Sequence, residues 1–241
     1  MTFAAKDRDS LLHAVFRVCE EISTMRSGPS NWQDHGEDEL WHELVGCILG
    51  SRVSHERAVM ALRYLRSTGL LNPRLGKCNL EEFERNIAQA LSQSMASSNR
   101  NPNGWRYPYP ALRANHIRRT VETIYRNGGS LHQILACSNN ANDARLRIVS
   151  IATGVGPKQA SLFLRNIGYA KDLAILDRHV LAYMTWLEII PGGINEVRTL
   201  RGYERLEGAF RSHARQIGFS VAHMDLAVWV VMRVLRREFA P

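Results

Sequence analysis

The sequence predicts an all-α protein, and three observations indicate it. Apolar residues recur at helical spacing along most of the chain, no segment alternates at the strand period, and no repeat of solenoid length is present. The chain has 241 residues, of which 45% are hydrophobic and 22% are charged, as in ordinary globular domains. A chain of this length hides roughly three-quarters of its surface on folding, so its stability requires no disulfide or metal.

Caps and breakers delimit the expected helices. The first amphipathic helix covers residues 9–26 and ends at the Ser27–Asn31 breaker. Ser54 is expected to cap the third helix, and Gly128-Gly129 to end the fifth. Three prolines keep residues 99–110 extended as a loop. The remaining helices before the central motif are expected at 37–49, 54–67, 80–94 and 113–126.

The charge balance indicates the class of partner. Thirty-one basic residues against twenty-three acidic ones give a net charge of +8, a pattern typical of nucleic-acid binding. No apolar run approaches the roughly 20 residues that cross a bilayer. The first residues, MTFAAKDRDS, carry charges where a signal peptide needs an apolar core. We therefore expect a cytoplasmic protein that has no membrane partner.

The four cysteines are scattered along the chain. No pair has the short spacing of a zinc knuckle or an iron–sulfur site, so no metal is expected. Cys19 and Cys47 lie within apolar helical patterns and are expected as buried free thiols.

Residues 151–181 hold the most informative pattern. Gly154-Val155-Gly156 predicts a tight hairpin between two helices, because glycine permits positive φ and close backbone approach. Pro157 suits the first position of the second helix, and Gly168 suits the position just past its end. The free N–H groups of such a hairpin and helix start favour binding of one DNA phosphate.

Two residues in this segment carry groups that could react. Lys158 lies in the first turn of the second helix, where the helix dipole disfavours the ammonium form and favours the nucleophilic neutral amine. Asp177 follows the apolar run 173–176 and precedes a helix, as a cap or as a carboxylate at a buried edge. Each feature alone is typical of an ordinary turn, a solvated lysine or a helix cap. Their combination favours a reaction site.

The combined motif resembles a known family. Residues 154–160 (GVGPKQA) and 175–179 (ILDRH) are similar to the helix-hairpin-helix-GPD superfamily of DNA glycosylases. Within it they resemble the short 8-oxoguanine DNA glycosylase/AP lyase family of archaea and some bacteria. The resemblance covers roughly residues 37–235. It also includes 40–54 (LWHELVGCILGSRVS), 109–117 (YPALRANHI), 160–169 (ASLFLRNIGY) and 224–229 (MDLAVW).

The resemblance implies a fold and a reaction. It implies one domain, 1–241, with two helical lobes and the hairpin 151–168 at the active-site cleft. The approximate lobes would be 53–170 and 1–52 plus 171–241. Lys158 would attack C1′ of a flipped-out nucleotide and form a Schiff base, after which the strand is cut by β-elimination. Asp177 would stabilise the positive charge that develops on the sugar. The implied substrate is DNA with an oxidised purine, above all 8-oxoguanine.

The resemblance also assigns supporting residues. Gly154, Gly156 and His179 would bind DNA phosphates. Tyr109 and Trp229 would stack on the flipped base, although either could equally be a core residue. The family needs no cofactor for catalysis, and a monovalent cation at the hairpin is compatible with it. We expect a monomer.

The sequence departs from the family at two places that bear on specificity. Arg52-Val53 stands where the family has an asparagine followed by an aromatic residue, so Arg52 becomes the candidate to fill the gap left by the flipped base. Pro241 ends the chain where the family uses a terminal lysine carboxylate to recognise the oxidised base. Two alternatives therefore stay open: a glycosylase for another modified base, with a role in defence against foreign DNA, or a non-catalytic DNA-binding module. A non-catalytic module would not need both Lys158 and Asp177.

Overall fold

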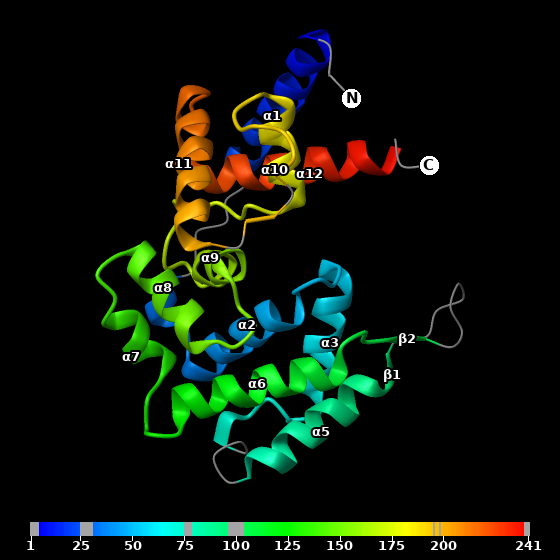
Figure 1. Ribbon diagram of the computed structural model, residues 1–241, viewed down its shortest axis with the longest axis vertical. Helices are drawn as coiled ribbons and strands as arrows, with labels where there is room; N and C mark the ends of the chain where they lie inside the picture. Colours follow the sequence, from blue (N-terminus) through cyan, green and yellow to red (C-terminus); the bar gives the residue numbers. More distant parts are fainter. Residues whose placement is uncertain are drawn as a thin grey trace. The chain divides into compact units, whose positions relative to one another are not determined.

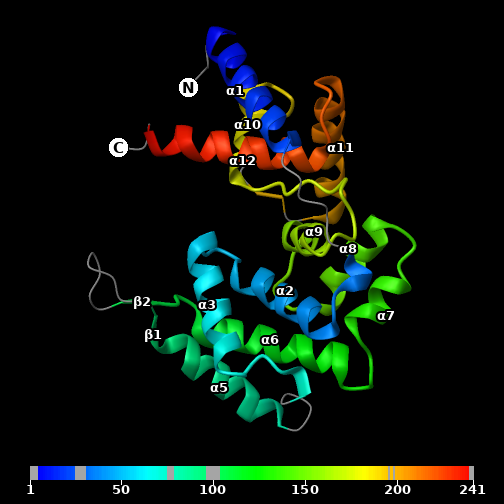
Figure 2. The same ribbon diagram turned by 180° about the vertical axis from the view of Figure 1, so that it is seen from behind.

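The computed structural model describes residues 5–24, 31–74, 79–95, 104–194, 196–197 and 199–238 (Figures 1 and 2). These residues form helices joined by loops and one short two-stranded ladder, which confirms the all-α prediction. The helices are α1 (Ala5–Thr24), η1 (Trp32–Asp34), α2 (Glu37–Leu49), α3 (His55–Ser67), α5 (Leu80–Ser92), α6 (Pro110–Tyr125), α7 (Leu131–Ala136), α8 (Ala141–Ile151), α9 (Pro157–Asn166), α10 (Arg178–Trp186), α11 (Leu200–Gln216) and α12 (Val221–Glu238).

The chain divides into two compact units. Unit 1 comprises Met1–Pro29 and Gly168–Pro241, and unit 2 comprises Ser30–Ile167. The second boundary lies close to the expected 170/171, but the first lies earlier than the expected 52/53. Residues 30–52 belong to unit 2 because α2 packs against α3, α6, α7 and α9, all of that unit.

Unit 2 is built around the apolar helix α2. Its buried residues are Leu40, Trp41, Leu44, Val45, Cys47, Ile48 and Leu49. The Trp41 indole N–H donates to the carbonyl of Leu71 at 2.7 Å, and the Tyr107 hydroxyl donates to the carbonyl of Leu49 at 2.6 Å. Helices α5 and α6 lie side by side in this unit (Figures 1 and 2).

Helix α6 and the loop before it differ from the sequence-based expectation. Strand β1 (Ser94–Met95), which follows α5, pairs with β2 (Trp105–Arg106) of that loop in an antiparallel ladder. Strands of two residues are too short to reveal a period in the sequence. Helix α6 begins at Pro110 rather than at residue 113, because proline occupies its first position and Tyr109 becomes the N-cap.

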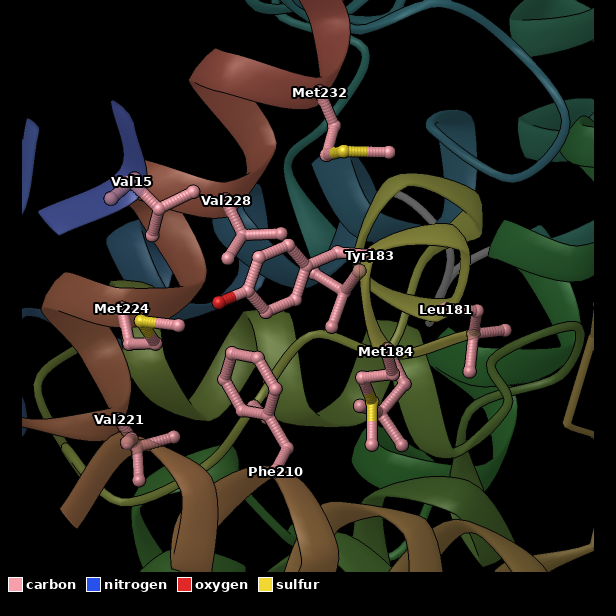
Figure 3. Close-up of a cluster of buried hydrophobic side chains, with 14 of the residues drawn as sticks. Val15, Leu181, Tyr183, Met184, Phe210, Val221, Met224, Val228 and Met232 are labelled. Atoms are coloured by element: carbon pink, nitrogen blue, oxygen red, sulfur yellow. The ribbon is translucent and has the colours of Figure 1, made fainter. Parts of the chain in front are cut away.

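Unit 1 encloses a core contributed by α1, α10, α11 and α12. Figure 3 shows part of this core, with Tyr183 of α10 among apolar side chains of the other helices. Cys19 of α1 is a buried free thiol here, as predicted, and Cys47 is one in unit 2. The predicted breaker 27–31 lies largely outside the described residues, and so do Cys78 and Pro241.

In the part of the chain that the structure describes, no single helix is long and apolar enough to cross a membrane. Helices α11 and α12 meet the length and composition criteria only as a pair bent by 95°.

Candidate active site

The hairpin between α8 and α9 has the predicted local structure. Gly154 has a φ of +79°, and Pro157 is the first residue of α9. The Val155 N–H donates to the carbonyl of Ala152 at 3.1 Å and closes the turn. The Thr153 N–H donates to Oγ1 of Thr120 on α6 at 3.1 Å. The hairpin is therefore anchored to α6.

Glycine occurs at the two hairpin positions for different structural reasons. The His116 ring of α6 lies over Gly154, and a Cβ at Gly154 would approach its Nδ1 to 2.1 Å. Glycine at 154 is thus required both by φ and by space. Gly156 instead has a φ of −97° and is the N-cap of α9. The hairpin uses positive φ at Gly154 but not at Gly156, because a helix N-cap adopts extended backbone.

Lys158 is the second residue of α9 and is half-buried. In the described part of unit 2, no carboxylate forms an ion pair with its amine. No side chain caps the start of α9, so its first N–H groups point outward as an anion site. Lys158 also interacts electrostatically with the buried thiol of Cys47 on α2. Burial raises the pKa of the Cys47 thiol well above its usual value, Glu43 raises it further, and Lys158 opposes the rise.

Asp177 is the N-cap of α10, as the sequence predicts. Its Oδ1 accepts hydrogen bonds from the N–H of His179 at 2.8 Å and of Val180 at 3.0 Å. Both bonds end at Oδ1, so Oδ2 takes no part in the cap. The half-buried carboxylate is therefore fixed in direction while one oxygen remains outside the cap.

Two buried carboxylates hold the extended segment that leads to Asp177. Glu207 of α11 accepts the N–H of Ala174 at 3.0 Å, and Asp225 of α12 accepts the N–H of Ile175 at 3.1 Å. Their side chains are 2% and 3% exposed. These carboxylates accept the backbone N–H groups that a neighbouring strand would otherwise pair, and they fix the backbone directly before Asp177.

Tyr203 of α11 completes this support. Its buried hydroxyl donates to the carbonyl of Ala174 at 2.6 Å and accepts the N–H of Leu176 at 3.0 Å. Sequence reasoning missed Tyr203, Glu207 and Asp225. Asp225 alone gave a signal, as an acid within the apolar MDLAVW helix that matches the family.

His179 lies in the first turn of α10 with a ring that is 7% exposed. The Arg178 Nε–H donates to its Nε2 at 3.4 Å. Burial lowers the pKa of His179 below its ordinary value, Asp177 opposes this, and Arg178 adds to it. Its contact with a DNA phosphate stays a prediction.

The remaining candidates lie on the surfaces of their own units. In unit 2, Tyr109 is 39% exposed, and Arg52 is exposed with a φ of +62°. In unit 1, Trp229 is partly exposed, and the Arg233 guanidinium lies 4.8 Å from its ring centroid. Unit 2 therefore carries Lys158, both hairpin glycines, Tyr109 and Arg52, whereas unit 1 carries Asp177, His179 and Trp229.

Among the described residues, no group of three or more His, Cys, Asp or Glu side chains is arranged to hold a metal ion. A cavity of about 210 Å³ in unit 2 is lined by His35, Glu39, His42, Glu43, Leu62, Arg66 and Ile167. The cavity does not include Lys158, so it is separate from the hairpin site.

Comparison with known proteins identifies the family. The model of the 8-oxoguanine DNA glycosylase family (Ogg-HhH) matches residues 24–219. The chain belongs to this 8-oxoguanine DNA glycosylase family. It is 31% identical over 224 residues to the 8-oxoguanine DNA glycosylase/AP lyase of Metallosphaera sedula, with 92% of each chain covered. It is 31% identical over 217 residues to that of Saccharolobus solfataricus, covering 88% of this chain and 89% of the relative.

Solved structures agree with this assignment of the glycosylase family. The 8-oxoguanine DNA glycosylase of Thermotoga maritima is 26% identical and superposes with a TM-score of 0.63, covering 94% of this chain and 90% of that one. The Methanocaldococcus jannaschii 8-oxoguanine glycosylase/lyase in complex with DNA is 21% identical, with a TM-score of 0.64 and coverage of 97% and 92%. This second likeness supports the fold.

Proposed function

We propose that this protein is a bifunctional DNA glycosylase/AP lyase that removes 8-oxoguanine from DNA and then cuts the strand. The observation that best supports this proposal is the position of Lys158. Its half-buried amine, without an ion-pair partner in the described part of unit 2, follows a glycine hairpin that offers free N–H groups to a phosphate. The curated relatives of at least 30% identity bear the name of this activity.

The proposed reaction takes place between the Lys158 amine and a nucleotide flipped out of the duplex. The nucleotide leaves the base stack, because C1′ cannot be reached inside a duplex. The Lys158 amine forms a bond to C1′ while the glycosidic bond breaks, and the base departs with the bonding electrons and takes up a proton. The nitrogen of the resulting C1′–N linkage loses a proton, and the C1′–O4′ bond then breaks. This opens the sugar ring, forms the C1′=N Schiff base and leaves O4′ to take up a proton. Loss of a C2′ proton then expels the 3′ phosphate, and water releases Lys158.

The other residues stabilise the developing charge and orient the DNA in this proposal. Asp177 faces the positive charge that develops on the sugar, and its helix cap fixes its direction. The hairpin amides bind a backbone phosphate, and Tyr109 and Trp229 stack on the base. The chemistry needs no cofactor. A monovalent cation bound by the hairpin carbonyls is compatible with it. Lys158 and Asp177 come from one chain, so the proposal is for a monomer, in the cytoplasm with its DNA substrate.

A cleavage panel tests this proposal. Duplex and single-stranded oligonucleotides, each with one modified base, are incubated with the protein with and without borohydride. We expect the fastest excision for 8-oxoguanine and a covalent adduct after reduction of the Schiff base. Binding without excision or adduct on every substrate would instead indicate a non-catalytic DNA-binding module.

One observation favours a second substrate assignment within the same chemistry. Arg52 is exposed with a φ of +62° at the position where the family has an asparagine before an aromatic residue. A long cation there would fill the gap in the duplex differently and so alter the choice of base. If another modified base is excised faster than 8-oxoguanine in the panel, the protein is a glycosylase for that base.

A further inference from the structure

A single buried arginine joins three segments of unit 2 that the sequence singles out separately. Arg113 of α6 is 3% exposed, and its Nη2 donates to the carbonyl of Ser51 at 2.6 Å. Its guanidinium carbon lies 5.7 Å from the ring centroid of Tyr109. Its Nη1 bonds to Nδ1 of His116 at 3.1 Å, and the His116 ring covers Gly154. The loop before Arg52, the stacking candidate and the hairpin therefore meet at Arg113.

The charge of Arg113 is not explained by stability. Among the described residues, no carboxylate pairs with it, and its buried Nε has no hydrogen-bond partner. A buried cation without a counter-ion costs stability, and an apolar side chain would fill this position at lower cost. Arg113 is therefore better explained by what its contacts with Ser51 and His116 hold in place than by a contribution to folding.

The contact with His116 fixes the state of the imidazole. Arginine only donates hydrogen bonds, so Nδ1 of His116 accepts, and the neutral ring carries its proton on Nε2. Protonation would put a second N–H against the guanidinium and break the bond. Burial, Arg113 and Arg119 all lower the pKa of His116, and both arginines lie on its own helix. The facing hairpin, Gly154-Val155-Gly156, brings no charged side chain.

We propose that Arg113 and neutral His116 are a positioning pair. The pair fixes the position of the Gly154 hairpin and the Lys158 turn relative to Tyr109 and the loop that carries Arg52. The pair would couple the grip on the phosphate to recognition of the base. This inference rests on the proposed function, because it assigns the pair a task in that reaction. Neither residue is proposed to touch the reacting atoms.

The proposal predicts a pH dependence with a definite sign. Since the folded-state pKa of His116 is lowered, its contribution is fully present above the ordinary histidine value of about 6.5. As the pH falls below that value and through the folded-state pKa, the proton is taken up, the bond to Arg113 is lost, and the hairpin loosens. Excision should fall in the same range.

Three variants test the pair. His116→Asn keeps an acceptor near Nδ1 but neither titrates nor covers Gly154. Arg113→Gln removes the guanidinium that bonds to Ser51 and His116. Arg126→Gln, an exposed cation near the other end of α6, controls for lost charge. Single-turnover excision is measured from pH 5 to 8 at saturating enzyme. In the same pH series, hydrogen exchange of amides 153–158 is measured in the free protein.

We expect His116→Asn to slow excision about tenfold at neutral pH, equivalent to ~1.4 kcal/mol. Its profile should lack the acid limb that the wild type shows below about pH 6.5. Amide exchange in the hairpin should be faster in His116→Asn and Arg113→Gln and unchanged in Arg126→Gln. Gly154→Ala should be tolerated better in a His116→Ala background, because the ring that meets the new Cβ is gone.

Two results would overturn the positioning pair: a His116→Asn profile with the wild-type acid limb, or hairpin exchange equal to that of the wild type. If Arg113→Gln fails to fold, His116→Asn decides alone. Failure of the proposed function looks different. The wild type would then neither excise nor form a borohydride adduct, while the exchange measurement would still report whether the pair holds the hairpin.

Discussion

Lys158 and Asp177 both stand at the start of a helix, but the structure holds them in different ways. Lys158 is positioned by its neighbours in sequence: a glycine at φ +79°, an N-cap glycine and a proline at the first helical position. Asp177 is positioned from far away, by side chains of α11 and α12 that bind the backbone before it. Local backbone rules shape the turn at Lys158, and contacts with α6 then hold it. The segment before Asp177 takes its shape from buried polar contacts with distant helices.

The two residues are therefore vulnerable to different substitutions. The hairpin should be sensitive to substitutions that change its backbone freedom and to loss of the α6 contacts that hold it. The segment before Asp177 should be sensitive to the loss of any one buried acceptor, because an N–H left unpaired in the core is costly. Substitutions in the two regions test this contrast.

The largest effect is expected for Asp177→Asn, which separates charge from position. Asparagine caps helices about as well as aspartate, so folding and lesion binding should stay near wild type. Excision should slow by a factor on the order of a hundred or more, because the lost charge acts in the transition state. Single-turnover excision beside a thermal melt and a binding titration measures both. Unfolding with unchanged excision per folded molecule would make Asp177 a purely structural cap.

The next effect is expected for Gly154→Ala in the hairpin. Alanine at positive φ costs about 1–2 kcal/mol, and its Cβ would also meet the His116 ring at 2.1 Å. Gly128→Ala is a matched control, since Gly128 has a φ of +77° with no atom within 4 Å of the added Cβ. We expect both variants to lose stability, but only Gly154→Ala to lose DNA affinity, by roughly tenfold. Equal affinities in the two variants would show that the approach of His116 is irrelevant.

The smallest effect is expected for Tyr203→Phe in unit 1. Removing its hydroxyl leaves the N–H of Leu176 without its acceptor, at a cost of about 1–3 kcal/mol in stability. Tyr183→Phe is the control, because it removes a buried hydroxyl that contacts His213 at 2.9 Å instead. Excision per folded molecule should fall severalfold in Tyr203→Phe alone, measured by single-turnover kinetics. Identical kinetics in the two variants would mean that Tyr203 stabilises the core without orienting Asp177.

The same contrast explains what the sequence could predict. The hairpin, Pro157 at the first helical position and the Asp177 cap follow rules that span a few residues, and all three are confirmed. The family could be assigned because its motif is equally local, and the family comparison confirms it. The catalytic assignments of Lys158 and Asp177 stay predictions.

The supports of the site could not be predicted, for a physical reason. Glu207 and Asp225 bind backbone 33 and 50 residues away, and an acid on a helix is ordinarily solvated. His116 approaches Gly154 only after α6 and the hairpin have packed. Residues 30–52 belong to unit 2 because α2 packs against α9, a contact across more than a hundred residues that no local pattern reveals.

The proposed reaction requires the Lys158 amine to become covalently linked to the sugar. The most direct measurement is borohydride reduction with an 8-oxoguanine duplex, then proteolysis and mass spectrometry of the adduct peptide. We predict the adduct on Lys158, its absence in Lys158→Gln, and wild-type yield in Lys171→Gln, which removes an exposed lysine of unit 1. An adduct on another amine, or full trapping by Lys158→Gln, would contradict the account.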